Sequence, residues 1–90
     1  MKETRLIHIS GTVQGVGFRA FTARCAQRHG VFGYVQNMET GKVEVIAYGG
    51  KGALDRFEEN LQHGHSVAQV TTFTSKLIEH SGTVSGFRIV

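Results

Sequence analysis

The chain has 90 residues, of which 40% are hydrophobic and 19% charged, and its formal net charge is +3 at pH 7. This composition is typical of a globular protein and excludes a disordered or fibrous chain, while the length indicates one domain over residues 1–90. No apolar run approaches the roughly 18 residues that a membrane-spanning helix needs, and the opening residues lack the apolar core of a signal peptide. We therefore expect a cytoplasmic protein with no membrane partner.

The cysteine count and the charge distribution limit which kinds of functional site are possible. Cys25 is the only cysteine, so an intramolecular disulfide and a CxxC motif are both excluded, and we expect a small core residue there. Residues 1–30 hold five basic side chains against one acidic side chain, whereas the remainder holds five against six. The positive field therefore lies on the N-terminal segment, which favours an anionic ligand there.

The first predicted elements are a strand and a helix joined by a glycine-rich loop. Residues 5–13 alternate apolar with polar side chains and predict a half-buried strand. Apolar or small side chains then recur with a period of about 3.6 residues and predict a helix over residues 19–29. Gly30 can end this helix in a left-handed conformation.

A hairpin and a second helix follow along the chain. Residues 31–49 contain two runs rich in β-forming side chains around Met-Glu-Thr-Gly, and Gly41 can adopt the positive φ that such a turn needs. The segment 51–64 predicts an amphipathic helix. The apolar side chains that carry this helical spacing are Leu54, Phe57 and Leu61.

Two final strands complete the predicted fold, at residues 67–78 and 86–90. The order βαββαβ with a short extra C-terminal strand predicts the α+β class. Right-handed crossovers would place both helices on one face of a mainly antiparallel sheet, which is a ferredoxin-like sandwich. This fold hosts unrelated functions, so the functional site has to be identified from its own residues.

The loop between the first strand and the first helix has the features of a phosphate-binding site. In the sequence GTVQGVGFRAF, residues 11–21, Gly15 and Gly17 can turn successive backbone N–H groups toward one point. The helix start adds unpaired N–H groups and the positive end of the helix dipole, and Arg19 adds a planar cationic group. A glycine loop before a helix also occurs as a simple tight turn, so both interpretations stay open at this point.

The common nucleotide-binding patterns do not fit this sequence. Ala20 stands where a GxGxxG pattern starting at Gly15 requires its third glycine. Neither Gly-Lys pair, at residues 41–42 and 50–51, is followed by the Ser or Thr of a Walker A motif. If the loop binds a ligand, the sequence therefore argues against a conventionally bound nucleotide.

The motifs GTVQGVGFR, GYVQN, GKVEV and the closing GFRIV together resemble the acylphosphatase family over essentially the whole chain. The resemblance implies an enzyme that hydrolyses the carboxyl-phosphate anhydride bond of small acyl phosphates to a carboxylate and inorganic phosphate. It implies no metal and no cofactor, with inorganic phosphate as product and inhibitor. We expect the protein to act as a monomer.

The resemblance also assigns the site residues. Arg19 corresponds to the catalytic, phosphate-binding arginine, and Asn37 to the asparagine that positions the attacking water. Local sequence alone favours a turn residue that enters the hairpin at Asn37, and only the resemblance assigns it the water. Neither motif contains a general base, which is compatible with the family mechanism, in which a phosphate oxygen of the substrate accepts the proton of the water. The loop whose backbone amides bind the phosphate consists of Gln14, Gly15, Val16, Gly17 and Phe18.

Two other classes of protein share this size or order of elements. RNA-recognition domains stack bases on aromatic side chains of their first and third strands. Here residues 5–13 contain no Phe, Tyr or Trp and the third strand offers only Tyr48, which argues against a nucleic-acid partner. A regulatory domain that binds a small anion without turnover stays open.

Two local features of the sequence need separate comment, a pair of histidines and two differences from the family pattern. His63 and His65 have a spacing seen in metal sites, but no cysteine or carboxylate cluster accompanies them, so we expect a solvated turn and no metal there. The segment 63–67 also lacks the prolines that the family often has before its fourth strand, and Ala20 replaces a bulkier residue or proline. These departures concern substrate preference and local rigidity.

Overall fold

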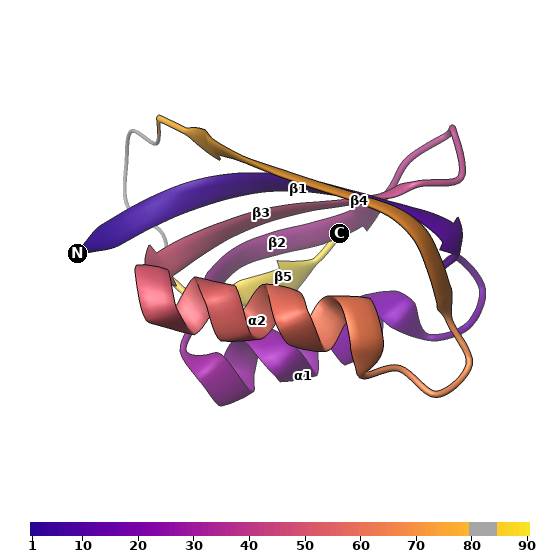
Figure 1. The fold of residues 1–90 in the computed structure, drawn as a ribbon, viewed down its shortest axis with the longest axis horizontal. Coiled ribbons are helices and arrows are strands. Elements are labelled where there is room, and N and C mark those ends of the chain that lie inside the picture. Colours follow the sequence, from indigo (N-terminus) through magenta and orange to yellow (C-terminus); the bar gives the residue numbers. More distant parts are fainter. Residues whose placement is uncertain (80–84) are drawn as a thin grey trace.

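The computed structural model describes residues 1–79 and 85–90. Both helices cover one face of a single sheet (Figure 1), which confirms the predicted ferredoxin-like α+β sandwich. No helix in the described ranges is long and apolar enough to cross a membrane. The elements in chain order are β1 (Lys2–Thr12), α1 (Phe18–His29), β2 (Phe32–Asn37), β3 (Val43–Gly50), α2 (Lys51–His63), β4 (Gln69–Ile78) and β5 (Phe87–Ile89).

The five strands are ordered β4-β1-β3-β2-β5, and every neighbouring pair is antiparallel except β2 and β5, which are parallel. The first strand begins three residues earlier than its alternating pattern predicted, because Lys2 still pairs with Gly50 at the end of β3. The pairing of β1 with β4 shifts register after Ser10. At that shift only glycine fits, since a Cβ on Gly11 would lie 2.0 Å from the carbonyl oxygen of Gln69.

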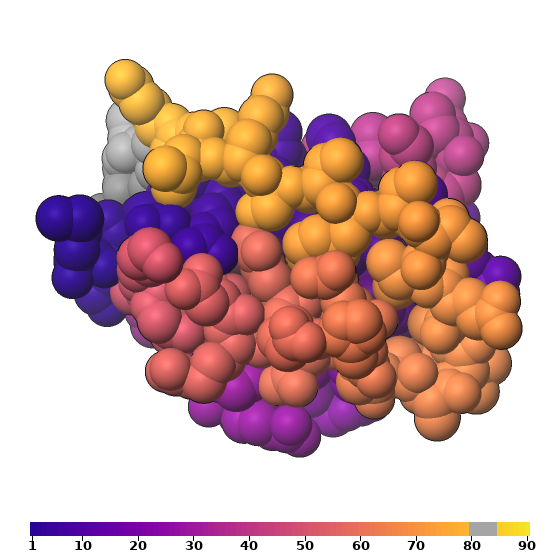
Figure 2. Space-filling view, in the orientation of Figure 1, coloured from indigo at the N-terminus to yellow at the C-terminus, as the bar shows by residue number. Residues whose placement is uncertain are grey.

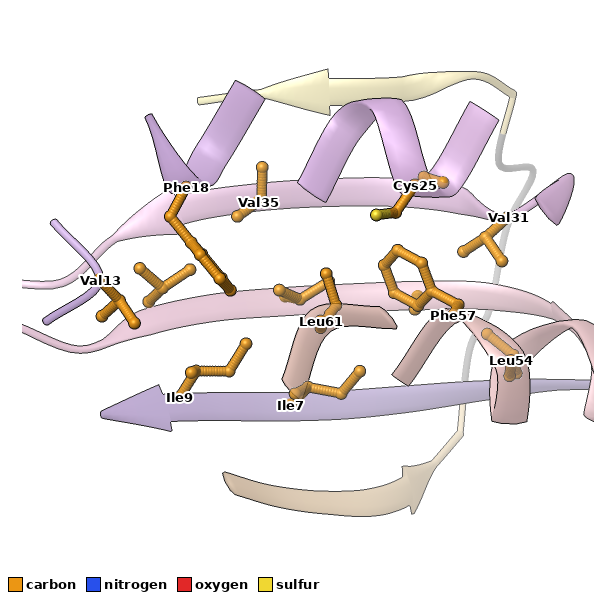
Figure 3. Packing of buried hydrophobic residues seen from close by; sticks show 14 residues of the cluster. Ile7, Ile9, Val13, Phe18, Cys25, Val31, Val35, Leu54, Phe57 and Leu61 are labelled. Carbon is orange, nitrogen blue, oxygen red and sulfur yellow. The ribbon is translucent and has the colours of Figure 1, made fainter. Parts of the chain in front are cut away.

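The hydrophobic core lies between the sheet and the two helices. Alternate side chains of β1 and β3 point into it, and α2 contributes the three apolar residues that its spacing predicted. Phe18 points into this layer from the start of α1, and Cys25 fills it from the middle of the helix, which confirms the predicted core cysteine (Figure 3). Side chains of α2 and β4 lie against one another along the face seen in Figure 2.

A cluster of charged side chains joins β1 to α2. Arg5 is 9% exposed, and its guanidinium donates to three carboxylates: Glu3 at 2.8 Å, Asp55 at 2.8 Å and Glu58 at 3.0 Å. Ser75 of β4 donates to the same Glu58 carboxylate. Carboxylates of both β1 and α2 thus pair with one nearly buried cation, which fixes the position of α2 over the sheet.

Candidate active site

The loop between β1 and α1 has the backbone conformation that its sequence predicts. Gly15 and Gly17 adopt φ values of 79° and 78°, in the left-handed region that other residues rarely enter. A Cβ at either position would meet no atom within 4 Å. The requirement for glycine is therefore one of backbone conformation, which directs the peptide groups, and not one of space.

The backbone amides of this loop are available to bind a ligand. Within the described ranges, the N–H groups of residues 14–20 have no intramolecular acceptor, and the first to find one is that of Phe21, which donates to the Gly17 carbonyl at 3.0 Å. Gly17 is the N-cap of α1, and no side chain caps this helix. The free N–H groups and the positive end of the helix dipole therefore point to an anion-binding site.

Arg19 lies in the first turn of α1 and reaches toward the sheet. One of its terminal nitrogens, Nη1, donates to the carbonyl oxygen of Val90 at 3.1 Å. The N–H of Val90 in turn donates to the Val35 carbonyl at 2.9 Å, which continues the pairing of β5 with β2. The contact holds one nitrogen of the guanidinium and leaves its other N–H groups able to bind an anion beside the loop.

Asn37 is the last residue of β2 and pairs with Val43 of β3. Val35, two residues earlier, is fully buried under the helices, so the alternation of the strand places Asn37 on the same face of the sheet. Its exposed side chain makes no hydrogen bond to any described residue. Asn37 is therefore both a residue at the start of the hairpin turn and an amide free to bind water on the helix-covered side.

Gln14 connects the loop to the hairpin that carries Asn37, a contact that local sequence did not predict. Its side-chain Nε2 donates to the carbonyl oxygens of Met38 and Lys42, both at 2.9 Å. These two carbonyls lie 24 and 28 residues further along the chain. Only the folded hairpin brings them together, so no sequence signal near Gln14 could have identified the contact. The two parts of the candidate site are held at a fixed separation by one side chain.

The remaining loop side chains anchor the loop to the core. Phe18 is 1% exposed and Val16 packs against the core cluster. Since these two side chains face inward, their backbone N–H groups are the parts that remain available to a ligand. This division of roles is compatible with the predicted use of residues 14–18 through their amides.

His65 lies in the connection after α2, but its ring is only partly exposed, so the prediction of a solvated side chain was wrong there. His63, the last residue of α2, is 69% exposed. The His65 ring packs against Phe18 and Phe21, with centroid distances of 5.9 and 5.0 Å. Its Nδ1 accepts hydrogen bonds from the backbone of the connection between α2 and β4. The proline-free connection before β4 thus contributes an aromatic side chain that contacts the first turn of α1.

Two other features of the surface lie away from this site. A cavity of about 440 Å³ at the C-terminal half of α1 is lined mainly by apolar groups, together with Arg24 and Gln27. On the sheet face opposite the helices, Glu44 accepts hydrogen bonds in a polar cluster. The bond with His8, opposed in part by burial and supported by Gln36 and Tyr34, holds the pKa of Glu44 below its ordinary value of 4.5. Glu44 therefore lies on the face of the sheet opposite Asn37.

Within residues 1–79 and 85–90, the side chains that could hold a metal ion are not gathered in one place. In the part of the chain that the structure describes, no group of three or more His, Cys, Asp or Glu side chains converges. The candidate site instead combines backbone amides, a guanidinium and a neutral amide. Such a set binds a polyanionic group and a water molecule.

Comparison with known proteins identifies the family. The sequence model of the acylphosphatase family matches residues 6–89. An acylphosphatase from Alkalilimnicola ehrlichii is 46% identical over 71 residues, covering 79% of this chain and 80% of its own length, and one from Thermus thermophilus is 40% identical over 81 residues, covering 90% and 91%. The crystal structure of acylphosphatase from Bacillus subtilis matches with a TM-score of 0.90 and 34% identity, covering 100% of this chain and 99% of its own. The chain therefore belongs to the acylphosphatase family of hydrolases.

Proposed function

We propose that this acylphosphatase binds the phosphoryl group of its substrate at the loop of residues 14–18 and at Arg19, and that Asn37 positions the attacking water. The observation that supports the assignment is the row of backbone amides at residues 14–20, which have no acceptor among the described residues, together with Arg19 in the first turn of α1. Gln14 supplies the link to the second part of the site, since it bonds the hairpin that carries Asn37.

The proposed reaction is an in-line displacement at phosphorus. The oxygen of the water that Asn37 orients forms the new bond to phosphorus, and the bond between phosphorus and the acyl oxygen breaks. The carboxylate leaves with the bonding electron pair and needs no protonation, because a carboxylate is a stable anion. A phosphoryl oxygen accepts the proton that the water loses, so the products are a carboxylate and inorganic phosphate.

The contribution of the protein is positioning and electrostatic stabilisation. The loop amides and the Arg19 guanidinium can hold the three phosphoryl oxygens while charge redistributes among them. Asn37 can donate to and accept from one water molecule at the same time, which restricts its orientation. All these groups belong to one chain, so we expect a monomer, and inorganic phosphate should inhibit by occupying the same loop. We expect the enzyme in the cytoplasm.

The test separates phosphate binding from water positioning. Arg19→Ala should lower the release of phosphate from acetyl phosphate by roughly 10²-fold or more and weaken inhibition by inorganic phosphate, and Arg19→Lys should recover little because it lacks the planar guanidinium. Arg24→Ala is the matched control, since it removes an exposed arginine from the same helix. Near-native activity and phosphate inhibition in a folded Arg19→Ala variant would show that the site lies elsewhere.

Asn37 should affect chemistry and not binding. Asn37→Ala should lower kcat sharply while the inhibition constant of phosphate stays within about threefold, because the lost contact is to the water. Asn37→Asp keeps the size but adds a negative charge, so it should also weaken phosphate inhibition. If Asn37→Ala turns over acetyl phosphate normally, the residue is only part of the hairpin turn. A protein that binds phosphate but releases none from acetyl phosphate would instead be a regulatory anion-binding domain.

A further inference from the structure

The first turn of α1 carries the proposed phosphate site without the usual stabilisation of a helix start. Its N-cap is Gly17, which offers no side-chain cap, and its first turn contains no acidic residue to complement the dipole. These absences keep the N–H groups free for an anion. The order of this turn must therefore come from packing against other parts of the protein.

Three rings pack around this turn. Phe18 precedes Arg19 directly, Phe21 follows two residues later, and their ring centroids lie 5.7 Å apart. The third ring is His65, which comes from the connection between α2 and β4. It meets Phe21 edge to face at 5.0 Å and 85°, and Phe18 at 5.9 Å. These separations and the edge-to-face geometry are favourable for aromatic rings.

The position of the His65 ring is itself fixed. Its Nδ1 accepts the backbone N–H groups of Val67 at 3.1 Å and of Ala68 at 2.9 Å. Two donors on Nδ1 require that this nitrogen carry no proton, so the neutral ring has its hydrogen on Nε2. The ring is therefore oriented by its own connection and not only by its contacts with α1.

Gly64 allows this connection to approach α1 closely. A Cβ at Gly64 would lie 3.0 Å from Cζ of Phe21 and 2.7 Å from the carbonyl oxygen of Asn60. Its φ of −91° is one that any residue adopts, so the requirement is for space. Gly64 and His65 together form the surface against which the first turn of α1 packs.

We propose that His65 is a positioning residue for the phosphate site, acting through Phe18 and Phe21 on the turn that holds Arg19. The proposal rests on the assignment of the phosphate site to this loop and turn. Without the His65 ring, the turn spends part of its time out of the binding conformation. Apparent affinity then falls in proportion to the fraction of molecules that remain competent.

This mechanism has a kinetic signature that a purely structural role lacks. Saturating substrate draws the whole population into the competent conformation, so kcat should be retained, while KM for acetyl phosphate and the inhibition constant of inorganic phosphate should rise by the same factor. We expect that factor to be about three to ten, the range that corresponds to one aromatic pair. A loss of global stability alone changes neither constant at a temperature where the protein is fully folded.

The experiment uses variants that separate two features of His65, its aromatic ring and its hydrogen-bond acceptor Nδ1. His65→Phe keeps a ring and loses the acceptor, whereas His65→Asn keeps an acceptor near the same backbone and loses the ring. His65→Ala loses both. His63→Ala is the matched control, because His63 is 69% exposed and its Nε2 lies 3.4 Å from the Glu59 carboxylate one turn earlier on α2. Circular dichroism melts set the assay temperature well below unfolding for every variant.

The proposal expects raised KM and inhibition constants with unchanged kcat in the Ala and Asn variants, and values near wild type in His65→Phe and His63→Ala. If His65→Ala does not fold, the comparison of His65→Phe with His65→Asn tests the same prediction. The idea is overturned if folded Asn and Ala variants bind phosphate like the wild type, or if kcat falls in place of affinity. The Arg19→Ala variant separates the two proposals. If it is fully active, the assignment of the phosphate site is wrong, whatever the His65 variants show.

Discussion

Removing the side-chain amide of Gln14 should uncouple the two halves of the active site. Gln14 donates from one nitrogen to the carbonyl oxygens of Met38 and Lys42, both at 2.9 Å. Both carbonyls already take part in the hairpin turn, where the Met38 N–H donates to Lys42 at 2.8 Å and the Gly41 N–H donates to Met38 at 3.1 Å. Gln14→Ala therefore leaves neither carbonyl without a partner.

The magnitude follows from these contacts. Two neutral hydrogen bonds contribute roughly 0.5–1.5 kcal/mol each, and since no buried group is left unpaired, the loss should lie at the lower end, about 1–2 kcal/mol in the free energy of unfolding. For a domain of this size, each kcal/mol corresponds to about 4–8 °C in Tm. Gln14→Glu should cost more, because its carboxylate cannot donate and would face two carbonyl oxygens.

The effect on catalysis should exceed the effect on phosphate binding. The loop amides stay with α1, whereas Asn37 moves with the hairpin, so its water loses alignment with the phosphorus atom. A displacement on the order of 1 Å is enough for losses approaching 10²-fold, and we expect kcat to fall by about 10-fold or more in Gln14→Ala. The inhibition constant of inorganic phosphate should change by less than about threefold.

The assay is steady-state hydrolysis of acetyl phosphate with inorganic phosphate as inhibitor, combined with thermal melts. Gln27→Ala serves as control, because Gln27 is exposed on α1 and alanine is favourable in a helix. The reasoning is refuted if folded Gln14→Ala keeps the wild-type kcat. It is also refuted if kcat and phosphate affinity fall equally, since the loop itself would then have lost its shape.

Three further predictions concern the rest of the molecule. The pKa of Glu44 is lowered in the folded protein, so the stability that its carboxylate contributes is complete above pH 4.5 and is lost as the pH falls through the folded-state pKa. The difference in unfolding free energy between wild type and Glu44→Gln, measured by denaturant titration, should therefore shrink over that range. A difference that does not change with pH would contradict this prediction. Burial raises the pKa of the Cys25 thiol, although the charges of Arg28 and Arg24 act in the opposite direction. Iodoacetamide should therefore label Cys25 only in denaturant, which mass spectrometry can measure. Chelators should leave hydrolysis unchanged, because no cluster of metal-binding side chains forms within residues 1–79 and 85–90; activity lost to a chelator and restored by one metal would overturn the proposed mechanism.

The sequence alone determined the types of the elements and the shape of the loop. Alternation over residues 5–13 and the 3.6-residue spacing of α2 are local properties, and the structure confirms both. Gly15, Gly17 and Gly30 all adopt the left-handed conformation for which glycine is preferred. Such features depend on a few consecutive residues, so they can be read without knowledge of the fold. The family motifs added the identities of Arg19 and Asn37, whose roles stay predictions until they are tested.

Tertiary structure decided how these parts are held together. Arg19 bonds a carbonyl 71 residues away, and Gln14 bonds two carbonyls in a hairpin that local sequence does not connect to the loop. His65 had the local appearance of a solvated turn, yet packs against Phe18 and Phe21 because α2 ends above the start of α1. Contacts of this kind depend on which elements the fold places side by side, and a pattern over neighbouring residues carries no record of that placement.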